Sequence, residues 1–240
     1  MSLWEVRFQL TRGSLSLDID LAGGARPIAL IGANGSGKTT LLRTILGLEK
    51  AQMCKVRIGE QILHDSKEGI EVPVENRNLA YLPQGLGLFP HMTVAENLRF
   101  MKAGDNSSNA PGKGDESNRI MEELGVIKFS NRLPGQLSAG ERQKVALARV
   151  LLQKPGMVLL DEPASALDIL ARREVRIILA THLTELGIPT LLVTHDFRDV
   201  KQLSADLAYL CSGKIVQQGS LEEFQALTGD GFLSEFLAQP

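Results

Sequence analysis

A glycine-rich run near the N-terminus has the residue types and the spacing that bind phosphate. The run is Gly32-Ala33-Asn34-Gly35-Ser36-Gly37-Lys38-Thr39, and Thr40 follows it. It fits the pattern G-x-x-x-x-G-K-[ST] at every fixed position. Its glycines let backbone N–H groups approach phosphate oxygens, Lys38 adds a positive charge, and Thr39 offers a hydroxyl to Mg²⁺. The run therefore predicts a site for the phosphate chain of a nucleotide.

Two further groups of polar residues come directly after apolar runs. Asp161 and Glu162 follow residues 157–160, and His195 comes two positions after residues 190–193. If both runs are parallel strands, their carboxyl ends line the ligand crevice of the sheet. Asp161 could then hold Mg²⁺, while Glu162 orients or deprotonates a water. Adjacent acids also cap helices, and a lone histidine is often structural, so these alternatives stay open.

Gln84 follows another short apolar run, residues 79–82. An amide oxygen at the end of a strand could reach a metal ion or a water. A glutamine in this position can equally be solvated or cap a helix, so the spacing alone does not separate these interpretations.

The elements that must position these residues follow from the pattern of apolar side chains. Alternation predicts two N-terminal strands with a turn at 11–14, and further pairs of strands at 56–63 and 207–219. Continuous apolar runs at 28–31, 79–82, 157–160 and 190–193 predict buried parallel strands. Helices are expected at 40–46, 94–101, 117–124, 138–153 and 168–186, with Thr93 and Glu96 as a capping box. Residues 104–115 are rich in Gly, Ser, Asn and Pro, and they predict a flexible insert.

Composition excludes several classes of protein. The 240 residues carry a net charge of −2, which gives no electrostatic case for a nucleic-acid partner. No apolar run reaches the length of a membrane span, and the N-terminus lacks the apolar stretch of a signal peptide. Cys54 and Cys211 lie far apart without metal-like spacing, so we expect two reduced thiols in a cytosolic protein.

A further motif carries a family resemblance. Leu137-Ser138-Ala139-Gly140-Glu141, placed before a predicted helix, resembles the signature motif of ABC-type ATPases. The other motifs of that family occur in its order. They are a Walker A motif at 32–39, a Q-loop at Gln84, a Walker B motif with its glutamate at 157–162, a D-loop at 165–168 and a switch histidine at 195.

The resemblance implies an α/β fold and a set of roles. The fold is a P-loop NTPase core with a mostly parallel sheet, an N-terminal antiparallel β subdomain and a helical signature subdomain at about 88–152, within one ABC ATPase domain over 1–240. Two chains would enclose two ATP molecules, each bound by the P-loop of one chain and by Ser138 and Gly140 of the other. Thr39, Gln84 and Asp161 would hold Mg²⁺, and Glu162 would polarise the attacking water. His195 would touch the γ-phosphate, and Asp168 would link the two sites.

The sequence departs from the family pattern at two places, the signature motif and the turn that normally contacts adenine. Ala139 and Glu141 stand where Gly and Gln are usual. The turn at 11–13 lacks the aromatic residue that normally stacks on adenine, so Phe8 or the guanidinium of Arg12 could take that place. Phe8 can equally be a core residue.

The resemblance extends to a subgroup. Residues 88–94 and 63–77 look like those of importer ATPases for oxyanions such as molybdate, which usually carry a regulatory domain beyond about residue 240. The expected partners are a transmembrane permease and, indirectly, a periplasmic solute-binding protein, at the cytoplasmic face of the inner membrane. We expect residues 85–100 to dock on the permease through four exposed apolar side chains, Leu86, Leu88, Phe89 and Met92. The alternatives are an exporter or lipoprotein-release ATPase, a non-transport ABC protein, and a nucleotide-binding regulator without turnover.

Overall fold

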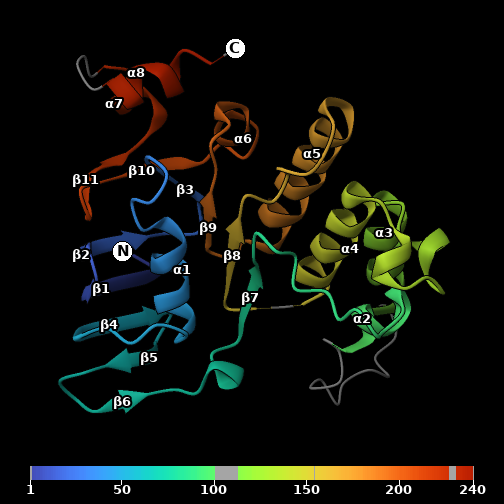
Figure 1. The fold of residues 1–240 in the computed structure, drawn as a ribbon, viewed down its shortest axis with the longest axis horizontal. Coiled ribbons are helices and arrows are strands. Elements are labelled where there is room, and N and C mark those ends of the chain that lie inside the picture. Colours follow the sequence, from blue (N-terminus) through green and yellow to red (C-terminus); the bar gives the residue numbers. More distant parts are fainter. Residues whose placement is uncertain (1, 101–112, 154, 227–230, 240) are drawn as a thin grey trace.

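The computed structural model describes residues 2–100, 113–153, 155–226 and 231–239. In these residues eleven strands form one mixed sheet, in the order β6-β5-β4-β1-β2-β11-β10-β3-β9-β8-β7 (Figure 1). The strands are β1 (Trp4–Arg12), β2 (Leu15–Gly23), β3 (Ile28–Ile31), β4 (Met53–Ile58), β5 (Gln61–Asp65), β6 (Ile70–Glu71), β7 (Leu79–Leu82), β8 (Met157–Asp161), β9 (Thr190–Val193), β10 (Asp206–Cys211) and β11 (Lys214–Gly219).

The strands divide into a parallel part and a mainly antiparallel part. Strands β10, β3, β9, β8 and β7 pair in parallel, as their continuous apolar sequences predict. Strands β2, β1, β4, β5 and β6 pair antiparallel, and β11 joins the two parts. The predicted α/β fold with a parallel core and an antiparallel N-terminal part is confirmed. The two parts share one continuous sheet.

Eight α-helices and three short 3-10 helices are described, and they lie on both faces of the parallel strands. The α-helices are α1 (Lys38–Leu46), α2 (Val94–Phe100), α3 (Lys113–Glu123), α4 (Ala139–Leu151), α5 (Ile169–Leu186), α6 (Phe197–Gln202), α7 (Leu221–Gln225) and α8 (Gly231–Leu237). The 3-10 helices are Val74–Asn76, Ile127–Phe129 and Pro134–Gln136. Figure 1 shows α1 beside the N-terminal strands and α2, α3 and α4 grouped on the other side of the molecule.

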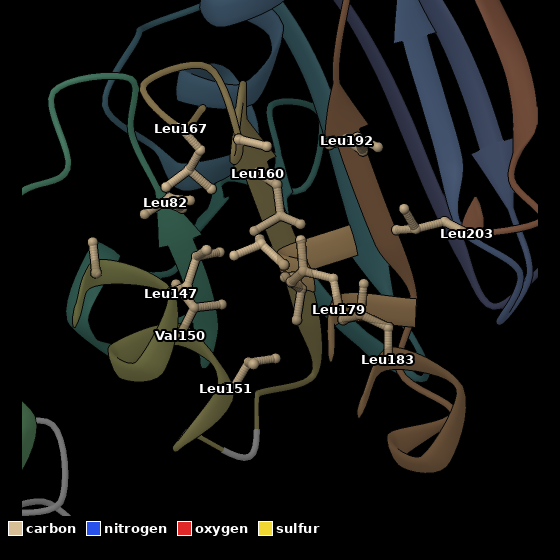
Figure 2. Packing of buried hydrophobic residues seen from close by; sticks show 14 of the residues in the cluster. Leu82, Leu147, Val150, Leu151, Leu160, Leu167, Leu179, Leu183, Leu192 and Leu203 are labelled. Carbon is tan, nitrogen blue, oxygen red and sulfur yellow. The ribbon is translucent and has the colours of Figure 1, made fainter. Parts of the chain in front are cut away.

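The alternation of side chains along the central strands builds two cores. Leu160 and Leu192 face the core that α4 and α5 cover, and this packing is shown in Figure 2. Leu159 and Leu191 face the opposite core, which is closed by α1 and the N-terminal strands. Because both faces are buried, neighbouring positions along these strands are all apolar, and the polar residues come only at the strand ends.

One predicted boundary is wrong. We expected a flexible insert over 104–115 and a helix from 117, but α3 begins at Lys113. The rest of the predicted insert, residues 104–112, lies outside the described residues.

No helix in the described part of the chain is both long enough and apolar enough to cross a membrane.

Candidate functional site

A cavity of about 710 Å³ opens where β3, β8 and β9 end. These three strands are neighbours in the sheet, so their carboxyl ends meet at one edge. The cavity is lined by Leu15, Asn34, Gly35, Gly37, Lys38, Thr39, Thr40, Gln84, Asp161, Glu162, Val193 and His195. The fold thus brings together residues from four motifs that lie up to 161 positions apart in the chain.

The phosphate-binding run forms the floor of this cavity. Gly37 caps α1 in a left-handed conformation (φ 105°) and makes no side-chain hydrogen bond to the helix. The first-turn N–H groups of a helix have no acceptor within the helix, so the start of α1 is open to an anion. A Cβ atom at Gly37 would lie 2.6 Å from the Leu17 side chain, so glycine also allows the close approach to β2.

Lys38 is almost fully buried in this loop. Its ammonium donates hydrogen bonds to the carbonyl oxygens of Gly32 (2.7 Å) and Ala33 (2.9 Å). Burial lowers the pKa of Lys38, and the nearby carboxylates of Glu162 and Asp161 oppose that shift. A buried cation beside the open end of a helix is the arrangement that phosphate oxygens would compensate.

Three members of the predicted binding run do not reach the cavity. Gly32 and Ala33 turn their carbonyl groups towards Lys38, and the hydroxyl of Ser36 is buried without a described hydrogen-bond partner. A Cβ atom at Gly32 would lie 2.3 Å from the carbonyl oxygen of Leu210. Gly32 and Ala33 therefore shape the loop, and Ser36 keeps an unpaired hydroxyl beside it.

Two hard oxygen ligands lie together at the wall of the cavity. The Thr39 hydroxyl donates to the Asp161 carboxylate at 2.9 Å. Burial raises the pKa of Asp161, while the hydrogen bond from Thr39 and the charge of Lys38 lower it. One carboxylate and one hydroxyl next to a phosphate site form the kind of donor set that Mg²⁺ takes from proteins. The residues present therefore fit this ion.

The next two polar groups, Glu162 and His195, are in contact at the wall of the cavity. The imidazole Nε2 of His195 lies 3.1 Å from a carboxylate oxygen of Glu162. Glu162 adopts a left-handed backbone conformation (φ 53°), and its N–H donates to the carbonyl oxygen of Val193 at 3.0 Å. This turn directs the Glu162 side chain into the cavity. Both side chains remain partly exposed, at 23% for Glu162 and 38% for His195.

Sequence reasoning missed a residue that holds the turn at Glu162. Gln143 on α4 is 1% exposed, and its amide donates to the carbonyl oxygens of Glu162 (3.3 Å) and Pro163. Its own oxygen accepts from the N–H of Ala166 at 2.9 Å. No local motif marks such a residue, although a buried glutamine on the apolar face of a helix is an unusual feature that a sequence can show.

The signature residues are not part of the cavity in this chain. Ser138 caps α4 and accepts from the N–H of Glu141 at 3.2 Å, while the Glu141 carboxylate accepts from the N–H of Ser138 at 2.7 Å. Gly140 follows in the first turn. Asp168 is exposed and caps α5 by accepting from the N–H of Ala171 at 2.9 Å. Ser138, Gly140 and Asp168, like Gly32, Ala33 and Ser36, are therefore predicted site residues that do not line the cavity.

Near the first turn, neither Phe8 nor Arg12 is placed to stack on a base, and the alternative that Phe8 is a core residue is confirmed. Phe8 is 3% exposed and belongs to the core. The guanidinium of Arg12 forms an ion pair with Glu49 at 3.0 Å, so it is not free to stack on an adenine ring. Leu15 is the residue from this region that lines the cavity. The aliphatic side chain of Leu15 thus takes the place that we had considered for Phe8 or Arg12.

The apolar surface after Gln84 is less open than we expected. Leu86, Leu88, Phe89 and Met92 are each only partly exposed. Leu86 and Leu88 pack against the core. The Phe89 ring meets Phe100 edge-on at 4.8 Å and lies under the guanidinium of Arg149 at 5.1 Å. Phe100 is the residue that presents a large apolar surface here, at 51% exposure.

Fold and site together define a nucleotide-binding protein of the P-loop type. The profile described as ABC transporter matches residues 16–165, and the chain belongs to this family. A molybdenum import ATP-binding protein of Azotobacter vinelandii is 39% identical over 92% of this chain and 60% of that protein. An Fe(3+) ions import ATP-binding protein of Pseudomonas fluorescens is 37% identical over 93% of this chain and 61% of that protein. The chain thus spans about 60% of the length of these relatives.

Solved structures agree with this fold. The ATP-binding subunit of an ABC transporter superposes with a TM-score of 0.82 over 98% of this chain and 99% of that chain, at 24% identity. A dimeric structure of a bacterial ABC transporter cassette superposes with a TM-score of 0.74 over 91% of this chain and 98% of that chain, at 25% identity.

Proposed function

We propose that the chain binds and hydrolyses ATP with Mg²⁺ as the nucleotide-binding subunit of an ABC importer. The observation that carries the proposal is the geometry of one cavity. The open start of α1, the Thr39–Asp161 pair and the Glu162–His195 pair all line one cavity of about 710 Å³. Phosphate binding, metal binding and activation of a water each have a group in place there.

Each residue has a role that follows from its position. Lys38 and the N–H groups at the start of α1 bind the phosphate oxygens. Thr39 and Asp161, with Gln84 from the same cavity lining, would hold Mg²⁺, which would neutralise charge on the phosphates. Glu162 accepts a hydrogen bond from the attacking water and orients it. His195 contacts the terminal phosphate, and its imidazole lies 3.1 Å from the Glu162 carboxylate, so the two groups act at the same place.

We further propose that the working unit is a homodimer. Ser138 and Gly140 lie outside the cavity of their own chain, which is expected if they complete the site of a second chain. The relative with the dimeric cassette structure supports this arrangement. Asp168, at the exposed start of α5, would then lie between the two sites.

The importer assignment and its substrate belong to the same proposal. Both reported relatives are import proteins, one for molybdenum and one for Fe(3+). We propose an oxyanion such as molybdate as the cargo, a transmembrane permease as the direct partner, and a periplasmic solute-binding protein as the indirect partner. The site of action is then the cytoplasmic face of the inner membrane. The half-buried segment 85–100, with exposed Phe100, is the proposed docking surface.

Glu162→Gln tests the hydrolytic role. An amide cannot polarise water as a carboxylate does, so we expect turnover to fall by at least about 100-fold while ATP binding remains. With Mg-ATP the variant should accumulate as a dimer in size-exclusion chromatography. Glu174→Gln, on the exposed side of α5, is the matched control and should behave as wild type. Wild-type turnover in Glu162→Gln would contradict the proposal.

The cargo is tested in the complex. The chain is co-purified with a tagged permease from membranes, and its ATPase rate is measured with the binding protein and molybdate, sulfate or Fe³⁺. Stimulation by molybdate alone supports the proposed cargo, and stimulation by Fe³⁺ alone contradicts it.

A further inference from the structure

The loop that carries His195 is held by a residue close to the end of the described chain. Gln239 lies two positions after α8, and its side-chain amide makes two hydrogen bonds to the backbone of this loop. The amide nitrogen donates to the carbonyl oxygen of His195 at 3.2 Å, and the amide oxygen accepts from the N–H of Phe197 at 3.0 Å. A single side chain therefore connects the backbone on both sides of Asp196.

The position of Gln239 is fixed by the packing of α8. Leu233 and Phe236 on this helix are buried. The Phe236 ring meets Phe197 edge-on, with ring centroids 5.7 Å apart, and Phe232 stacks on Tyr209 at 5.5 Å. Because Phe197 is the first residue of α6, the same segment is anchored to α6 by ring contacts and by the Gln239 hydrogen bond.

Other hydrogen bonds and ion pairs of this loop involve Thr194 and Asp196, the residues on either side of His195. Asp196 is paired with Arg176 and with Arg198, the latter at 3.0 Å. The Thr194 hydroxyl donates to Asp199. These contacts fix the two flanking positions, whereas Gln239 binds the backbone of His195 directly.

The His195 side chain has room to leave its present position. A second cavity of about 260 Å³ lies on the far side of the Glu162–His195 pair, and Glu162, His195 and Gln239 all line it. The imidazole is 38% exposed, so side-chain packing alone does not hold it against Glu162. The backbone of His195 must therefore be placed correctly for the 3.1 Å contact to form.

We propose that Gln239 is a positioning residue for His195: by holding the His195 carbonyl group and the Phe197 N–H group, it directs the imidazole to Glu162 and away from the second cavity. This inference rests on the proposed role of the Glu162–His195 pair in hydrolysis. It gives the segment after α8 a part in the chemistry, although no motif occurs there.

Two variants of Gln239 separate this role from a structural one. Gln239→Ala removes both hydrogen bonds. Gln239→Glu keeps an acceptor for the Phe197 N–H but loses the donor to the His195 carbonyl group. We expect kcat to fall about tenfold in both variants, because both lose the hydrogen bond to the His195 carbonyl group, while KM for ATP stays within about twofold of wild type. The unfolding midpoint should fall by a similar small amount in both variants, in Gln239→Glu because a carboxylate oxygen then faces the His195 carbonyl oxygen.

Gln218→Ala is the matched control, because Gln218 also donates to a backbone carbonyl group, that of Ala22, but far from the cavity. It should retain wild-type kcat. If kcat in the Gln239 variants follows only the loss of stability, or if Gln239→Glu retains wild-type kcat, the proposal is overturned.

A second readout does not depend on turnover. The imidazole resonances of His195 in the nucleotide-free protein, assigned with a His195→Gln variant, should shift in both Gln239 variants and not in Gln218→Ala. Unchanged resonances would overturn the positioning role. If wild-type protein does not hydrolyse ATP, the proposed function fails, and the NMR comparison still decides whether Gln239 positions His195.

Discussion

Helices α1 and α4 both begin at a motif that would meet phosphate, but their first turns are prepared in different ways. Gly37 leaves the start of α1 without a side-chain cap, inside a cavity that contains Asp161, Glu162 and His195. The start of α4 is closed by the capping box of Ser138 and Glu141, and it lies outside that cavity.

The difference suggests that the start of α1 can bind phosphate in the isolated chain, whereas the start of α4 needs a second chain before it can take part. A phosphate can bind at α1 without displacing a protein group, and the helix dipole favours it there. At α4 the Glu141 carboxylate already occupies a backbone N–H, so an arriving phosphate has to compete with a negative side chain. We therefore expect α1 to act in the isolated chain and α4 to act only when a second chain brings its nucleotide.

The largest expected effect is at α1. Lys38→Met keeps the length of the side chain and removes its charge, so affinity for ATP should fall on the order of 100-fold, the usual loss for charged hydrogen bonds to phosphate. Isothermal titration calorimetry measures this loss. Lys144→Met, at a partly exposed position on α4, is the control. Equal affinity in both variants would contradict the assignment of α1.

The next largest effect is expected at α4, where a substitution should lower turnover and leave the affinity for ATP unchanged. Ser138→Ala should leave the affinity of the isolated chain for ATP unchanged, lower turnover about tenfold, and cost about 1 kcal/mol of unfolding free energy through the lost cap. An equal mixture with Lys38→Met chains provides the decisive measurement. Each mixed dimer then has one intact site, so the mixture should regain about a quarter of wild-type turnover. No recovery would mean that Ser138 acts within its own chain.

A smaller effect is expected for the charge beside Ser138. Glu141→Gln retains an oxygen for the Ser138 N–H but removes the carboxylate, so the ATP concentration needed for half-maximal dimerisation should fall about two- to fivefold. Light scattering at increasing ATP measures it. The hydrogen bond from the Ser138 backbone lowers the pKa of Glu141 in the folded chain. Its contribution to stability is therefore complete above the unfolded value of 4.5 and disappears as the pH falls through the lower folded value.

The smallest effect concerns the base. The phosphate contacts at α1 are common to ATP and GTP, and the only described wall residue from the first turn region is the aliphatic Leu15. We expect the two affinities to agree within about tenfold. Leu15→Tyr should tighten both, since stacking of a base on an aromatic ring contributes roughly 1–3 kcal/mol. A preference of wild type for ATP above about 50-fold, or roughly 2.3 kcal/mol, would reveal a contact with the adenine edge.

Most of the residues that line the cavity at α1 can be singled out from the sequence because each motif is local. The strand, the glycine-rich loop and the helix at Lys38 are consecutive, and Asp161 and His195 each end an apolar run. The order of the strands, which brings these residues to one cavity, was not readable from spacing. Gln143 and Gln239 were missed because their bonds join distant segments. The exposure of Phe89, which lies outside the helices and strands, was predicted wrongly because the residues that cover it, Phe100 and Arg149, come from α2 and α4.

The position of β3 has a consequence for how the chain matures. The strand that leads into the phosphate loop hydrogen-bonds to β9 and β10, which are made only after residue 190. At a synthesis rate of about 5–20 residues per second, β3 waits roughly 10–40 seconds on the ribosome for its neighbours. Nucleotide therefore cannot stabilise the emerging N-terminal half. The apolar strand stays available to chaperones until the last quarter of the polypeptide has emerged.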